Sequence, residues 1–155
     1  MPLVRRAVPE DAEELVRLRK IMLDSMHPST DVSWQPATIA ALRSHLADPA
    51  GELTAFVVDA PAPGSGLAAC ATGAVHRGLG SPANPSGSSG HVFNVCTDPE
   101  HRRRGYSRAC VEALLAWYRE RGVRRVDLHA TAQGEPLYAS LGFTRTPSPA
   151  MRLTF

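Results

Sequence analysis

Hydrophobic and polar positions along the first third of the chain repeat with a helical period. The repeat predicts a helix with one buried face over residues 9–26, because apolar side chains recur every three or four positions. Its apolar positions are Leu15, Leu18, Met22 and Met26. The helix should begin at Pro9, since proline suits the first helical position and the acidic residues after it suit the helix dipole. A short strand is expected before it, over residues 2–8, and a second helix after it, over residues 36–48.

The middle of the chain changes to a strand pattern. Residues 53–60 and 67–75 are rich in β-branched and small apolar side chains and read as a hairpin. A Gly/Ser/Pro-rich stretch follows over residues 78–90 and is either a linker between domains or a mobile loop within one. We favour a mobile loop that covers a site, because the preceding strands are too few to close a core alone. Residues 91–98 form the most strand-like run in the chain.

The second half alternates helices with strands. A helix is predicted from residue 106 to its end at Gly122, a strand over residues 123–130, a short helix over residues 135–142 and a last strand over residues 151–155. This order implies an α/β (α+β) fold, a mixed sheet covered by helices on both faces. The strand–helix–strand unit of residues 91–130 should be parallel.

Composition and charge limit the possible functions. The 155 residues, of which 43% are hydrophobic, suit one domain spanning residues 1–155. The net charge of +2 is too small for a nucleic-acid surface over the whole molecule. Cys70, Cys96 and Cys110 fit neither a disulfide framework nor a metal site, since their number is odd and no C-x-x-C occurs. No apolar run reaches the length of a membrane span, so we expect a cytoplasmic protein that does not bind membranes.

The candidate chemistry lies where the strand of residues 91–98 gives way to a helix. The sequence there is Arg102-Arg103-Arg104-Gly105-Tyr106-Ser107. Unpaired backbone N–H groups and the positive end of the dipole make a helix start a natural phosphate site, and Gly105 lets a ligand approach the backbone. The alternative is a basic helix start that only adds solubility. Neither a P-loop nor a G-x-G-x-x-G is present.

Three blocks in this half resemble the GNAT superfamily of acyl-CoA-dependent N-acyltransferases. The Arg-x-x-Gly-x-Ser turn is similar to the family signature, although Ser107 stands where glycine or alanine is usual. "NVCTDPEHR" resembles the family's central strand and turn, and "LYASLGF" resembles its Leu-Tyr-x-x-x-Gly-Phe segment. The resemblance implies a mostly antiparallel sheet whose central strands splay apart, and acetyl-CoA as cosubstrate.

The resemblance also implies the roles of individual residues. Those expected to bind the cofactor are Phe93, Val95, Cys96, Thr97, Arg102, Arg103, Arg104, Gly105, Tyr106, Ser107 and Arg108. An amine would attack the thioester directly, and a backbone N–H near Val95 or Cys96 would stabilise the oxyanion. Tyr138 would protonate the leaving thiolate, and Asn94 would act beside the reacting centre or as a structural group. An acyl-enzyme on Cys96 is the less favoured route, since no histidine partner is fixed beside it in sequence.

The general base and the acceptor stay open at this level. Asn94, His91, His129, Glu100 or water could take the amine proton. Substrate-binding candidates are His27, Asp31 and Trp34, in the loop between the first two helices. A non-catalytic acyl-CoA sensor is the alternative function, and a homodimer through the edge strand of residues 151–155 is possible.

Overall fold

The computed structural model describes residues 2–155, and a five-stranded sheet forms its centre, in the order β1-β2-β3-β4-β5. The strands are β1 (Val4–Arg6), β2 (Leu53–Asp59), β3 (Leu67–Arg77), β4 (Ser88–Thr97) and β5 (Val126–Leu128). Neighbours from β1 to β4 are antiparallel, and β5 runs parallel to β4. The predicted mixed, mostly antiparallel sheet is therefore confirmed.

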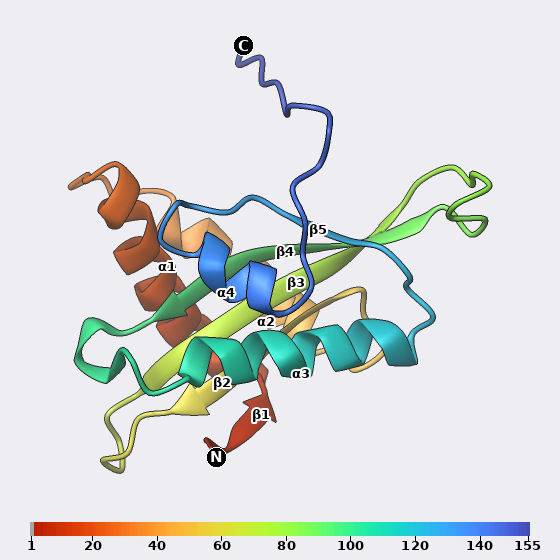
Figure 1. Ribbon diagram of the computed structural model, residues 1–155. Helices are drawn as coiled ribbons and strands as arrows, with labels where there is room; N and C mark the ends of the chain where they lie inside the picture. The colour runs from red at the N-terminus through yellow and green to blue at the C-terminus, as the bar shows by residue number, and fades with distance from the viewer. Residues whose placement is uncertain (1) are drawn as a thin grey trace.

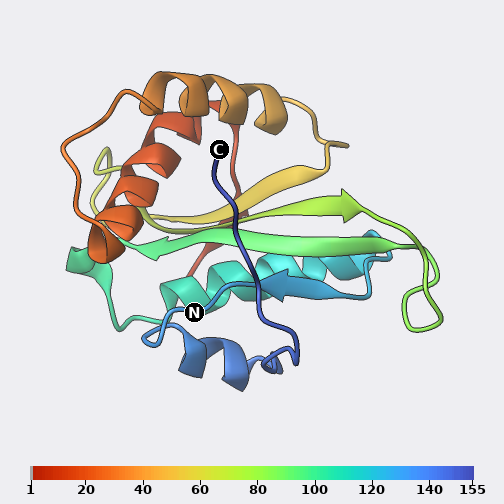
Figure 2. The same ribbon diagram turned by 90° about the horizontal axis from the view of Figure 1, so that it is seen from above.

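Helices cover both faces of this sheet (Figures 1 and 2). They are η1 (Pro9–Asp11), α1 (Ala12–Met26), α2 (Gln35–Leu46), η2 (Pro99–His101), α3 (Tyr106–Glu120) and α4 (Glu135–Ser140). Figure 2 shows α1 and α2 on one face and α3 and α4 on the other. Within residues 2–155, no helix combines the length and the hydropathy needed to cross a membrane.

Each face of the sheet has its own apolar core. On the α1 face, Leu15 and Leu18 are fully buried with Cys70, as the helical repeat predicts. On the α3 face, Tyr118 is buried and its hydroxyl lies 3.0 Å from the carbonyl oxygens of both Ala74 and His91. A Cβ at Gly90 would come within 2.6 Å of the Tyr118 ring, so only glycine leaves room for the ring at this position of β4.

A β-bulge changes the course of β4 near its end. Thr72 pairs with Phe93 and Cys70 with Cys96, so two residues of β4 oppose Ala71 alone. The first of them, Asn94, has a positive φ of 53°. Pairing between β4 and β5 runs from Gly90 to Val92 and stops just before this bulge. The two strands therefore separate beyond Val92, as the family resemblance implies.

The structure corrects several sequence-based expectations. Residues 144–155 are all exposed and form no strand within the described chain, so the predicted last strand is wrong. The predicted loop of residues 78–90 is shorter, because β3 and β4 stay paired out to Arg77 and Ser88. The first helical turn is a 3-10 turn, η1, and Met26 is 44% exposed rather than buried.

Candidate active site

The backbone of β4 beyond Val92 forms one wall of the candidate site. Asp98 donates its N–H to the carbonyl of Ala68 at 2.8 Å, toward β3. Because N–H directions alternate along a strand, the N–H of Cys96 also points toward β3 and that of Val95 points to the side that β5 has left. Of the two backbone donors expected for an oxyanion, the geometry therefore favours Val95.

The turn before α3 exposes unpaired backbone donors. Gly105 is the N-cap of α3 with φ of 78°, and no side chain caps this helix start. The N–H groups of residues 105–107 make no hydrogen bond within the described chain. Arg102, Arg103 and Arg104 are exposed, and none forms an ion pair among residues 2–155. Free donors, the positive end of the helix and three unpaired cations fit the diphosphate of coenzyme A.

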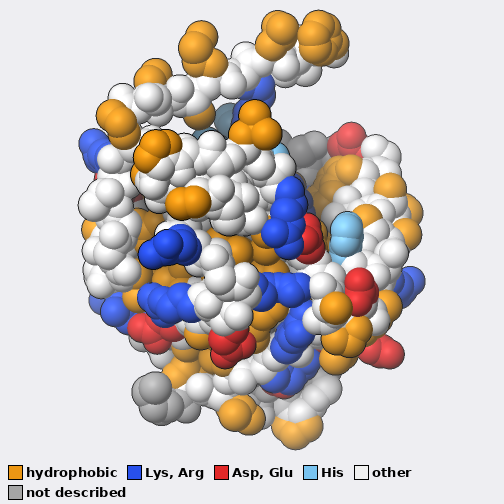
Figure 3. Space-filling view, turned by 90° about the vertical axis from the view of Figure 1, so that its right-hand side faces the viewer, with side chains coloured by type: hydrophobic (Ala, Val, Ile, Leu, Met, Phe, Trp, Pro, Cys, Tyr) orange, Lys and Arg blue, Asp and Glu red, His pale blue; other side chains and the backbone are white. Residues whose placement is uncertain are grey.

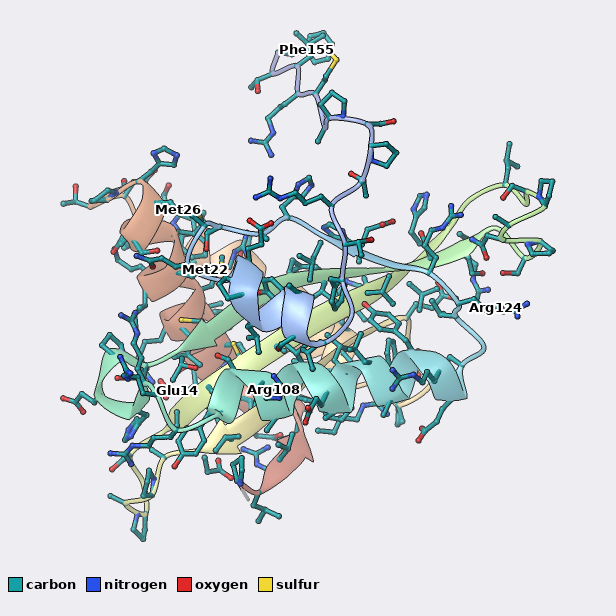
Figure 4. The ribbon with its side chains drawn as sticks, in the orientation of Figure 1. Glu14, Met22, Met26, Arg108, Arg124 and Phe155 are labelled. Atoms are coloured by element: carbon teal, nitrogen blue, oxygen red, sulfur yellow. The ribbon has the colours of Figure 1, made fainter. Side chains whose placement is uncertain are left out.

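Other side chains of this turn already have protein partners. The Ser107 hydroxyl is hydrogen-bonded to the hydroxyl of Thr97. Arg108 donates to Ser140 Oγ at 2.7 Å and to Glu112 at 3.2 Å, and it lies between α3 and α4 (Figure 4). Tyr106 is partly buried against the α3-face core. The cofactor roles predicted for these side chains stay predictions; they are Thr97, Tyr106, Ser107 and Arg108. In this structure the Arg108 side chain links α3 to α4.

Arg17 of α1 holds the end of β4, just before the arginine–glycine turn of residues 102–105. It donates to Asp98 at 2.7 Å, to Glu14 at 2.7 Å and to the carbonyl of Leu67 at 2.9 Å. Asp98 in turn accepts the N–H of Glu100 at 3.0 Å and so caps η2. Sequence reasoning missed Arg17, because its partner Asp98 is 81 positions away and no local pattern joins them.

Tyr138 lies on α4, on the α3 face of the sheet. Its ring packs edge-on against Phe143 at 5.8 Å between centroids, and burial raises the pKa of its phenol. No hydrogen bond engages the hydroxyl within the described residues. The group is thus a neutral phenol at physiological pH with a proton to donate.

Cys96 and Asn94 both turn toward α1. Cys96 is 7% exposed within the α1-face core, and burial raises its pKa to about 11. Asn94 is 6% exposed, and its Nδ2 is 3.5 Å from the carbonyl of Leu15, while its Oδ1 has no partner. This placement favours the structural role for Asn94 over the expected one beside the substrate. Its catalytic role stays a prediction.

The candidates for the general base divide into two places. His91 and Phe93 stack at 5.8 Å between ring centroids, and His129 meets His91 edge-on at 6.1 Å. Both histidines are exposed and lie where β4 and β5 begin to separate. Glu100 instead lies in η2, beside the arginine–glycine turn. The structure thus brings the two histidines, and not Glu100, to the splay, the place beyond Val92 where β4 and β5 separate.

The three predicted substrate residues do come together. His27, Asp31 and Trp34 line one pocket of about 230 Å³ at the end of α1, with Lys20, Leu23, Asp24 and Ser29. Hydrogen bonds from Ser33 lower the pKa of Asp31, so this carboxylate is anionic at neutral pH. Asp24 is paired with Lys20 at 2.6 Å, which leaves Asp31 as the unneutralised acid of the pocket.

Comparison with known proteins gives the class of the chain. The sequence model of the acetyltransferase (GNAT) family matches residues 15–143. The chain therefore belongs to this family.

Individual relatives agree with that assignment. A GCN5-related N-acetyltransferase from Ralstonia eutropha JMP134 superposes with a TM-score of 0.82 at 28% identity, over 99% of both chains. A predicted acetyltransferase from Clostridium acetobutylicum, crystallised with acetyl-CoA, has a TM-score of 0.84 at 23% identity, over 99% of this chain and 96% of that one. Mycothiol acetyltransferase of Thermobispora bispora is 45% identical over 62 residues, which are 38% of this chain and 21% of that protein.

Proposed function

We propose that the chain, as one domain over residues 1–155, transfers an acetyl group from acetyl-CoA to a primary amine by direct attack in a ternary complex. The observation that carries the proposal is the separation of β4 from β5 beside the uncapped start of α3. Together they supply a cleft edge with free backbone groups and a phosphate site at one end of the sheet. Family membership supports the acetyl donor.

Each part of the proposed reaction is assigned to particular groups of the chain. The N–H groups of residues 105–107 and the arginines before them hold the diphosphate. Val95 N–H stabilises the negative charge that develops on the carbonyl oxygen, a contribution of about 3 kcal/mol for one such donor. Tyr138 gives its proton to the departing thiolate.

Direct attack is supported by the state of Cys96. A thiol whose pKa is about 11 is protonated at neutral pH, and only a thiolate is an effective nucleophile. Cys96 also points into the α1-face core. An acyl-enzyme on this residue would need a base, and no hydrogen bond joins its sulfur to a histidine within the described residues.

We infer that the acceptor is a cationic amine with an apolar portion. The Asp31 carboxylate can hold an ammonium group, and Trp34 offers an aromatic surface in the same pocket. His91 and His129 are the favoured bases, because they are exposed beside the splay. The cytoplasmic location and a possible homodimer remain predictions that accompany this function.

The test begins with acetyl-CoA binding, measured by calorimetry and thermal shift, followed by an amine panel with detection of free thiol. Binding with thiol release is expected; binding without release from any amine would favour the acyl-CoA sensor. An absence of binding would overturn both functions.

Tyr138→Phe tests the proton donor. We expect kcat to fall by about a hundredfold, in line with general acid catalysis, with the dissociation constant of acetyl-CoA unchanged. On the alkaline side, kcat of the wild type should fall as the pH rises through the raised pKa of the phenol, because the acid must be protonated. Undiminished kcat in the variant would remove Tyr138 from the mechanism.

A further inference from the structure

The helix α1 presents different side chains to the sheet and to the pocket of Asp31. Leu15 and Leu18 belong to the α1-face core, and Met22 packs against it. The Cys96 thiol of β4 lies against the backbone of Met22. The residues of α1 that line the pocket are Lys20, Leu23, Asp24 and His27. At about 3.6 residues per turn, these two sets point to opposite sides of the helix. The pocket therefore opens on the side of α1 that is turned away from β4.

This placement separates the pocket from the proposed reacting centre. The N–H of Val95 points to the side of β4 that β5 has left, and that side belongs to the sheet. An α-helix with its side chains is about 10 Å across, so a group held by Asp31 lies on the order of 10 Å from the splay. A carboxylate also favours the charged form of a bound amine, and a protonated amine is not a nucleophile. The nitrogen that Asp31 holds is therefore not the nitrogen that attacks the thioester.

Apolar surface is available between the two places. Met26 follows Met22 by one turn on the same face of α1, and it is 44% exposed (Figure 4). Trp34 donates its Nε1–H to the carbonyl of Asp31 at 3.1 Å, which holds the indole ring beside the carboxylate. A flexible thioether and a fixed aromatic ring both suit a hydrocarbon chain. A ligand that runs around the end of α1, from the pocket to the splay, would contact Met26 on its way.

The charges of the molecule favour a cation at this end. The Asp31 carboxylate accepts the N–H of Ser33 at 2.8 Å, and among residues 2–155 it pairs with no Lys or Arg. At the other end of the sheet, Lys and Arg side chains gather across the middle of the face that Figure 3 shows. Arg124 lies at that end (Figure 4). Because like charges repel, a cationic ligand is steered away from that face and toward Asp31.

We propose that the acceptor is an aliphatic diamine or longer polyamine, in which an apolar spacer of roughly 10 Å separates the reacting nitrogen from a second, cationic nitrogen. This inference rests on the proposed acetyl transfer and names the substrate class of the same site. Asp31 holds the second nitrogen, and the spacer lies on Trp34 and Met26. The first nitrogen reaches the splay as the neutral amine.

The reaction then balances as follows for such a substrate. The neutral nitrogen forms a bond to the thioester carbon, and the bond between that carbon and sulfur breaks. A histidine at the splay takes the proton that the amine loses, and Tyr138 protonates the departing thiolate. The product is a diamine acetylated on one nitrogen, and its second nitrogen keeps its charge.

Matched amines test the substrate class through acetyl-CoA-dependent release of thiol. Diaminooctane is compared with octylamine, which has the same chain and one nitrogen, and with amino-octanol, which has a polar end without charge. We expect kcat/KM for the diamine to exceed the other two by roughly tenfold, the effect of one hydrogen bond to a charged group. Diaminopropane, whose spacer is too short, should be no better than propylamine.

The outcomes separate this inference from the function on which it rests. Thiol release from octylamine or amino-octanol as efficient as that from diaminooctane would overturn the inference and leave acetyl transfer standing. Bound acetyl-CoA with no thiol release from any amine would overturn both.

Substitutions test the anchor. Asp31→Asn keeps the size of the side chain and removes its charge. It should lower the ratio of kcat/KM for diaminooctane to that for octylamine by roughly tenfold, mainly through KM. Asp48→Asn is the matched control, because this exposed carboxylate accepts the N–H of Ala50 at 3.0 Å on the loop after α2. An Asp31→Asn variant that keeps the wild-type ratio, or an equal fall in Asp48→Asn, would contradict the proposed anchor.

Discussion

Gly105 shows at the scale of one residue why the signature needs glycine. Its φ of 78° lies in the left-handed region, while a Cβ placed there would meet no heavy atom within 4 Å. The requirement in the free chain is therefore conformational rather than steric. The same φ turns the start of α3 so that its first N–H groups stay uncapped.

Gly105→Ala should lower the free energy of unfolding by about 1 kcal/mol, the cost of a left-handed alanine, and should weaken acetyl-CoA binding. Gly122→Ala is the matched control, because Gly122 has φ of 75° and equally open surroundings at the other end of α3. Denaturant titration should show similar losses of stability for both. Equal acetyl-CoA affinities in calorimetry would contradict the role given to Gly105.

At the scale of elements, the Arg17 contacts join α1, the start of β3 and the end of β4. The hydrogen bond from Arg17 lowers the pKa of Asp98 below its ordinary value. A carboxylate whose pKa is lowered on folding stabilises the protein above the unfolded pKa. That stability is lost as the pH falls through about 4 toward the folded value.

Asp98→Asn should accordingly reduce the free energy of unfolding at pH 7, with a difference from wild type that shrinks as the pH falls below about 4. It should also raise KM for acetyl-CoA, since Asp98 caps η2 just before the arginine–glycine turn. Asp59→Asn is the control, because its pKa is lowered by Arg5 at the β1–β2 pair. If both variants raised KM equally, the effect would come from a general loss of stability and not from the cap of η2.

The sequence predicts those elements that depend on residues close together in the chain better than those that depend on residues far apart. Helix repeats and glycine ends are local, and they placed α1, α3 and α4 within a few residues. The family blocks placed the turn and Tyr138. The bulge at Asn94, the Arg17–Asp98 pair and the burial of Cys96 depend on neighbours remote in sequence. The alternation of apolar and polar residues over 151–155 is real, but a strand forms only beside another strand, and in the structure these residues pair with none.

At the scale of the whole molecule, different segments lie at the two ends of β4. The arginine–glycine turn follows its last residue, Thr97, and the hairpin of residues 78–87 precedes its first, Ser88. Ten residues of strand span about 30 Å. The hairpin therefore projects from the end of β4 that is remote from the arginine–glycine turn (Figure 1), and its role as a cover stays a prediction.

Replacing residues 79–86 by a two-residue Asn-Gly turn should leave kcat/KM within about twofold of wild type, since such turns close hairpins directly. Steady-state kinetics with the best amine of the panel would measure it. A severe rise in KM for that amine alone would restore the hairpin as a cover. Thermal unfolding serves as the control for a damaged sheet.

Because two residues of β4 oppose Ala71, the side chains that follow the β-bulge point to the opposite face of the sheet from the one that regular alternation would give. Val92 and Val95 face one layer of the molecule, and Phe93 and Asn94 face the other. Deleting Asn94 would restore regular pairing between β3 and β4. The hydrogen bonds between β4 and β5 would then be able to continue past Leu128. The protein would keep its layers and lose the separation of β4 from β5, so one extra amino acid accounts for the opening to which the proposed function assigns the thioester.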